Sequence, residues 1–166
     1  MDPDLSEEER ALRSLLGEAR VIAVVGISSK EWRPSHEVAS YLQDHGYRII
    51  PINPNESEVL GERAYPSLLD IPEDVRVDVV DVFRRPEHTA DVARDAVKVG
   101  ARLLWLQEGI ESEEAARIAQ EGGLDVIMGV CIKKVRQRLM AAEERDADRG
   151  EAQEGEAQAR EEGIDR

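Results

Sequence analysis

Cysteine is almost missing from this sequence, which contains only Cys131. A single cysteine excludes an intrachain disulfide framework and a cysteine-rich metal site. Long apolar runs are missing as well, since no stretch approaches the roughly 20 residues that are needed to span a bilayer. The first residues are acidic and lack the apolar core of a signal peptide. We therefore expect a cytoplasmic protein that does not interact with membranes.

Basic charge is also scarce, because 36 acidic residues face 22 basic ones and the net charge is -14. Such a surface repels a phosphodiester backbone, so we do not expect nucleic acid as a partner. The histidines at 36, 45 and 88 have no metal-ligand spacing, and no nucleophile stands in a recognisable order with a general base. We expect neither a metal site nor catalytic residues.

The sequence does contain a clear strand, loop and helix near its start. Val21 to Val25 is uniformly apolar and mostly β-branched, as in a strand that is buried on both faces of a parallel sheet. Pro34 suits the first turn of a following helix, Ser35 is its predicted cap, and Gly46 ends it. The amino end of that helix would point at the loop after Gly26 and favour an anion such as phosphate.

The rest of the chain repeats this alternation. Further strands are predicted over 48–52, 77–83, 102–106 and 125–128, with helices from about 86–100, 112–120 and 132–149, and residues 56–76 irregular except for a turn at 67–71. Helices between parallel strands imply an α/β fold with a doubly wound, five-stranded, Rossmann-like sheet in a single domain. We expect an amphipathic helix in residues 1–20, this domain in 21–142, and an acidic, largely disordered tail in 143–166.

Ligands of such sheets bind beyond the carboxyl ends of the strands. The first loop lacks G-x-G-x-x-G, because Ser28 and Glu31 stand where the second and third glycines would be. No acidic residue ends the second strand, where Asn53 follows Ile52, so the pattern disfavours a nicotinamide dinucleotide. The loops offer hydroxyl groups and cations instead, from Ser28, Ser29, Lys30, Arg33, Arg84 and Arg85. These groups suit a phosphorylated nucleotide, although Arg84 and Arg85 could equally form surface ion pairs.

Five segments together resemble the small CoA-binding proteins related to the N-terminal domain of the succinyl-CoA synthetase alpha subunit, over about residues 15–140. They are GISSKEWRPSHEVASYL, GYRIIPINPN, LGERAYPSLLDIP, VDVVDVFRR and LWLQEGI, in the family's order. The resemblance implies that Gly26, Ser28, Ser29 and Lys30 hold CoA phosphates with help from Arg33. It further implies that Asn53 and Pro54 lie near the adenosine, that Val82, Phe83 and Arg84 lie along its other side, and that Gln107, Glu108 and Gly109 lie near the pantetheine.

The resemblance therefore predicts a non-catalytic protein that binds CoA or acyl-CoA, since the phosphorylated histidine of the synthetase belongs to a further domain. Two alternatives stay open: a nicotinamide-dependent oxidoreductase, and a regulatory interaction domain with a vestigial pocket. A homodimer or another protein partner is also left open. Of the remaining residues, Trp105 and Cys131 are predicted to be buried.

Overall fold

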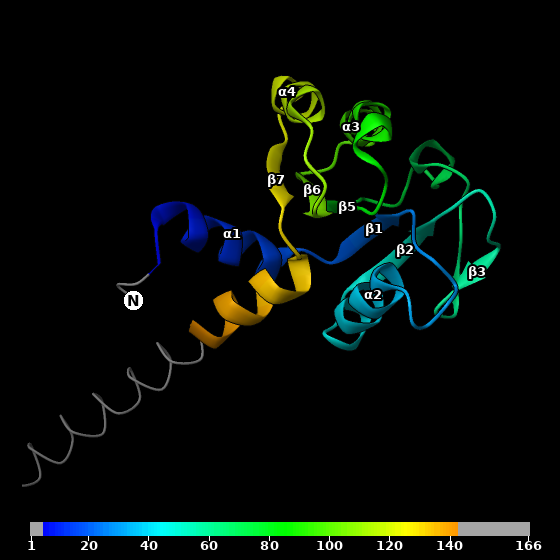
Figure 1. Cartoon of the computed structure of the whole chain (residues 1–166), viewed down its shortest axis with the longest axis horizontal. Coiled ribbons are helices and arrows are strands. Elements are labelled where there is room, and N and C mark those ends of the chain that lie inside the picture. The colour runs from blue at the N-terminus through cyan, green and yellow to red at the C-terminus, as the bar shows by residue number, and fades with distance from the viewer. Residues whose placement is uncertain (1–4, 143–166) are drawn as a thin grey trace, which may run out of the picture. The chain divides into compact units, whose positions relative to one another are not determined.

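The computed structural model describes residues 5–142 of the chain (Figure 1). The predicted acidic tail, residues 143–166, lies outside the described residues. The described residues divide into two compact units, one of residues 18–134 and one formed by residues 5–17 and 135–142. The larger unit contains the whole sheet and the helices that cover it.

The larger unit is built on a five-stranded parallel sheet. Its strands are β1 (Val21–Val25), β2 (Arg48–Ile52), β5 (Val79–Val82), β6 (Leu103–Glu108) and β7 (Asp125–Gly129). They are ordered β2-β1-β5-β6-β7 and every neighbouring pair is parallel. The predicted α/β fold with a doubly wound, Rossmann-like sheet is therefore confirmed.

Helices lie on both faces of this sheet (Figure 1). Helix α2 (Pro34–Asp44) covers one face, whereas α3 (Thr89–Lys98) and α4 (Glu113–Glu121) pack side by side on the other. Two short 3-10 helices, η1 (Leu68–Asp70) and η2 (Pro86–His88), precede β5 and α3. Sequence reasoning missed a small antiparallel hairpin, β3 (Glu58–Val59) with β4 (Glu62–Arg63).

The core explains why these elements pack closely. Helices α3 and α4 present fully buried alanines to the sheet, Ala93, Ala96, Ala115 and Ala119. Small side chains let the helices approach the β-branched residues of β1 and β5, such as Val25 and Val80. Trp105 is fully buried, as predicted, and its indole Nε1 donates a hydrogen bond to the Val130 carbonyl at 2.8 Å. Cys131 is only half-buried.

The smaller unit holds most of α1 (Glu7–Glu18). A capping box starts this helix, because the Glu9 amide donates to Ser6 Oγ and the Ser6 amide donates to Glu9 Oε1. Glu9 also forms an ion pair with Arg138, in a helical segment that occupies residues 132–142 of the described chain. Among residues 5–142, no helix has the length and apolar content needed to cross a bilayer.

One local prediction is wrong, namely the cap of α2. The helix begins at Pro34 with Arg33 as its capping residue, and no side chain caps it. Ser35 Oγ instead accepts a hydrogen bond from the Ser28 amide at 3.0 Å. The hydroxyl therefore stabilises the preceding loop and not the helix end.

Candidate functional site

A cavity of about 540 Å³ opens at the carboxyl edge of the sheet, where β1 lies between β2 and β5. The chain leaves β1 toward one face of the sheet and leaves β5 toward the other, so this is the topological switch point at which doubly wound sheets bind ligands. Five predicted ligand residues line the cavity: Gly26, Asn53, Pro54, Phe83 and Arg84. The size suits part of a nucleotide-like ligand.

Gly26 allows the ends of β1 and β5 to approach each other closely. Its φ is +85°, and a Cβ built there would lie 2.3 Å from the Phe83 carbonyl oxygen. The Phe83 amide donates to the Val25 carbonyl at 2.8 Å, and the Gly26 amide donates to the Ile52 carbonyl at 2.9 Å. Glycine is needed here because both the left-handed backbone and the close approach exclude a side chain.

The loop between β1 and α2 is ordered by its serines. Ser28 Oγ accepts from the Lys30 amide at 3.1 Å, and Ser29 Oγ donates to Glu56 Oε1 at 2.8 Å. Lys30 and Arg33 are exposed. Within residues 5–142, no carboxylate pairs with either cation. The loop lies beside the cavity. The cavity wall does not include its predicted ligand residues Ser28, Ser29, Lys30 and Arg33.

Asn53 joins this loop to the end of β2. Its Nδ2 donates to the Ile27 carbonyl at 2.8 Å, and its Oδ1 accepts from the Asn55 amide at 2.8 Å. Both hydrogen bonds fix the side chain, which stands where a dinucleotide dehydrogenase would carry an acidic residue. Pro54 follows it in the exposed rim of the cavity.

Sequence reasoning missed the wall that α3 contributes. Asp91, Val92 and Asp95 line the cavity from α3, and His88 lines it from the end of η2. The spacing of Asp91, Val92 and Asp95 places them on one face of α3, so the sequence could have grouped these residues but could not have placed them at the cavity. Partial burial raises the pKa of Asp95, while Lys98 lowers it in part. Asp91 and Asp95 give this wall an acidic character.

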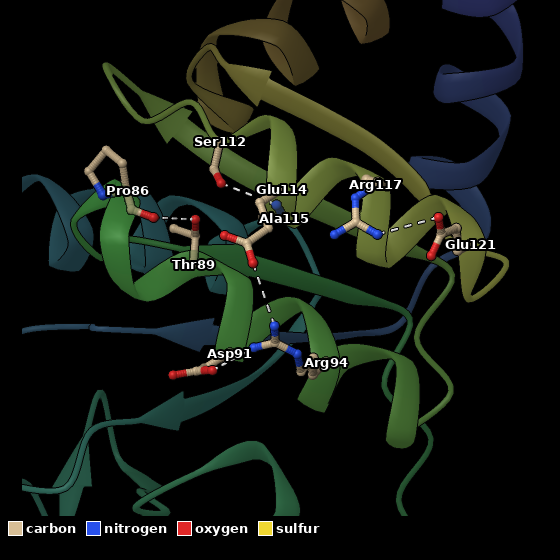
Figure 2. A network of polar contacts seen from close by, with 9 residues as sticks. All are labelled: Pro86, Thr89, Asp91, Arg94, Ser112, Glu114, Ala115, Arg117 and Glu121. Atoms are coloured by element: carbon tan, nitrogen blue, oxygen red, sulfur yellow. Dashed lines mark hydrogen bonds and ion pairs between the residues drawn. The ribbon is translucent and has the colours of Figure 1, made fainter.

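Figure 2 shows how α3 is fixed against α4. Arg94 pairs with Asp91 on its own helix at 2.7 Å and reaches Glu114 on α4 at 3.6 Å. Thr89 Oγ1 donates to the Pro86 carbonyl at 2.7 Å, and so ties the start of α3 to η2. Asp91 therefore both lines the cavity and takes part in the contacts that hold α3.

The other predicted ligand residues lie outside the cavity wall, and the side chains of Gln107 and Glu108 in β6 already contact other residues of the chain. Gln107 is buried, donates from Nε2 to Asp81 Oδ1, and accepts from the Ile132 amide at 3.3 Å. Glu108 pairs with Lys134 at 3.2 Å. Gly109 has a φ of +81°, and Val82 is fully buried in β5. None of these four lines the cavity that the described residues form.

Asp81 is the buried acid that Gln107 contacts. Its carboxyl is fully buried, and in the described part of the chain Oδ2 has no hydrogen-bond partner. Burial raises the pKa of Asp81 to about 8, against the opposing hydrogen bond from Gln107. The group is therefore largely protonated at neutral pH. Among residues 5–142, no three His, Cys, Asp or Glu side chains gather as metal ligands.

The comparisons with known proteins agree with the geometry. A family model described as a CoA binding domain matches residues 20–137. The uncharacterised protein YneT of Bacillus subtilis (strain 168) is 43% identical over 122 residues, which cover 74% of this chain and 89% of YneT. The ADP-forming acetate–CoA ligase II of Archaeoglobus fulgidus is 31% identical over 116 residues, or 63% of this chain, but the chain spans only 17% of that ligase.

Solved structures show the same relationships. A hypothetical protein from Pyrococcus horikoshii OT3 superimposes with a TM-score of 0.77 at 37% identity, over 82% of this chain and 94% of that protein. The dinucleotide-forming acetyl-coenzyme A synthetase 1 of Ca. Korarchaeum cryptofilum gives a TM-score of 0.60 at 25% identity, over 70% of this chain and 28% of the synthetase. The fold thus occurs both in small proteins and as a part of larger synthetases.

Proposed function

This chain belongs to the CoA-binding domain family, and on that premise we propose that it binds CoA or acyl-CoA at the carboxyl edge of its sheet. The observation that carries the proposal is the cavity at the switch point between β1 and β5. Doubly wound sheets bind nucleotide-like ligands at this place. The predicted residues Gly26, Asn53 and Phe83 all line it.

The phosphates of CoA are proposed to bind over the loop between β1 and α2. Lys30 and Arg33 supply two cations that no carboxylate within residues 5–142 neutralises. The amino end of α2 lies at Pro34, directly after this loop, and adds its dipole to theirs. Arg84, half-buried in the cavity wall, provides a third cation. A ligand with several phosphates would meet complementary charge here.

The acidic wall supports the same orientation of the ligand. The carboxyl groups of Asp91 and Asp95 suit hydrogen-bond donors, such as the hydroxyl and amino groups of adenosine. We therefore place the adenosine between Asn53, Pro54 and α3. The pantetheine would then run toward Gln107, Glu108 and Gly109, at the carboxyl end of β6.

The proposed role is binding without catalysis. The relative YneT matches this chain over most of its own length, so the domain occurs in small proteins as well as in ligases. Ligation itself would need chemistry that the proposed site residues do not supply, because cations and hydroxyl groups hold phosphates without forming a covalent intermediate. The cytoplasmic location and a protein partner, including a second copy of the chain, stay predictions.

Replacing Lys30 with alanine should weaken CoA binding about tenfold or more, because a charge-assisted hydrogen bond contributes roughly 1.5–3 kcal/mol. Titration calorimetry on wild type and variant measures this. Arg48→Ala is the matched control, since it removes one exposed positive charge at the opposite end of β2. Equal losses in the two variants, or no loss in Lys30→Ala, would contradict the proposed phosphate site.

A further inference from the structure

The two tryptophans of the chain have opposite environments. Trp105 is fully buried, whereas the side chain of Trp32 is 71% exposed on the loop between β1 and α2. A single exposed apolar residue is normal on a protein surface and needs no explanation by itself. Trp32 differs because of the two side chains that lie over its ring.

Both loop cations contact the indole of Trp32. Lys30 Nζ lies 5.5 Å from the ring centroid, and the guanidinium carbon of Arg33 lies 4.7 Å from it. Both distances are within the range of about 6 Å in which the aromatic quadrupole attracts a cation. One ring therefore holds two like charges that no carboxylate in the described part of the chain compensates.

Hydrogen bonds of the backbone fix the shape of the loop that carries Lys30, Trp32 and Arg33. The Lys30 amide donates to Ser28 Oγ at 3.1 Å, and the Arg33 amide donates to the Lys30 carbonyl at 3.0 Å. The Ser28 amide in turn donates to Ser35 Oγ in the first turn of α2. Both cations therefore contact the Trp32 ring in the absence of a ligand.

We propose that Trp32 is a positioning residue, which holds Lys30 and Arg33 together as a ready-made cation pair for neighbouring phosphate groups of CoA. The inference rests on the proposed function. A long, flexible cation loses conformational entropy when it is ordered on a ligand, and a side chain that is already ordered on a ring loses less. The ring also offsets the repulsion between the two cations in the free protein.

A double-mutant cycle tests this role. Trp32→Ala should weaken CoA binding about three- to tenfold in the wild-type background, whereas Trp32→Phe, which keeps an aromatic face, should stay within about twofold. In the Lys30→Ala Arg33→Ala background, Trp32→Ala should change the affinity less than about twofold, because the residue acts only through the cations. Leu69→Ala is the control for truncating an exposed apolar side chain, since Leu69 is 51% exposed and lies outside the cavity wall.

The possible outcomes separate this inference from the function on which it rests. Equal losses from Trp32→Ala in both backgrounds would mean that the ring touches the ligand directly, and would overturn the positioning role. Unchanged binding by Trp32→Ala in a wild type that binds CoA would also overturn it, with the proposed function intact. Failure of the wild-type chain to bind CoA would overturn both. Circular dichroism of each variant checks that this exposed substitution leaves the fold unchanged.

Discussion

Replacing Gly26 with alanine is expected to lower the free energy of unfolding by about 2 kcal/mol or more and to weaken CoA binding at least about tenfold. The added Cβ would lie 2.3 Å from the Phe83 carbonyl oxygen, and the backbone at Gly26 has a φ of +85°. Either β1 or β5 must move to relieve the contact. The movement would displace Phe83 and Arg84 from the cavity wall.

Gly46→Ala is the matched control for this experiment. Gly46 has a similar φ of +93°, but a Cβ built there meets nothing within 4 Å. Gly46→Ala should therefore lower the free energy of unfolding only by the cost of backbone strain, about 1 kcal/mol, and leave CoA affinity unchanged. Chemical denaturation and calorimetry measure both quantities. Similar stability losses in the two variants would show that the approach of β1 to β5 is not tight, against the geometry described above.

The second large effect concerns pH, through the buried carboxyl of Asp81. Its pKa in the folded protein is about 8, whereas its ordinary value is 3.8. Between these values the folded protein keeps a proton that the unfolded chain releases, so stability should fall as the pH rises and should level off above about 8. The slope approaches about 1.4 kcal/mol per pH unit if this group acts alone.

Asp81→Asn removes the titration while keeping the shape and the acceptor for Gln107 Nε2. Urea denaturation at pH 5, 6, 7 and 8 should give a smaller decline in the free energy of unfolding for the variant than for the wild type. The comparison uses the slopes, because the amide introduces donors of its own and changes the absolute stability. Parallel slopes for the two proteins would contradict the elevated pKa.

The sheet was predictable because its strands have strong local signals. Val21–Val25 is apolar at every position and mostly β-branched, as is typical of a strand buried on both faces. The caps at Ser6 and Ser112 were predictable for the same reason, since each bond joins residues three apart in the sequence. The hairpin of β3 and β4 was not, because strands of two residues are too short to show an alternating pattern.

The site was predictable only in part because its residues depend on packing. Gly26 and Asn53 follow strands directly, so their place at the sheet edge is visible in the sequence. The wall of His88, Asp91 and Asp95 depends on how α3 is rotated against the sheet, which local spacing does not specify. The pairing of Asp81 with Gln107 joins adjacent strands across 26 residues, and no local pattern indicates it. Ser35 was misassigned because its hydroxyl accepts a hydrogen bond from the Ser28 amide, seven residues away, which helix-cap patterns do not indicate.

Titration calorimetry of the wild-type chain with CoA and with NAD tests the central claim most directly. CoA should bind at least about tenfold more tightly than NAD, because the additional phosphate of CoA can meet Lys30, Arg33 or Arg84. NAD would find the fixed amide of Asn53 where a carboxylate is needed for its ribose. Equal affinities for the two ligands, or tighter binding of NAD, would contradict the proposal that the site binds CoA.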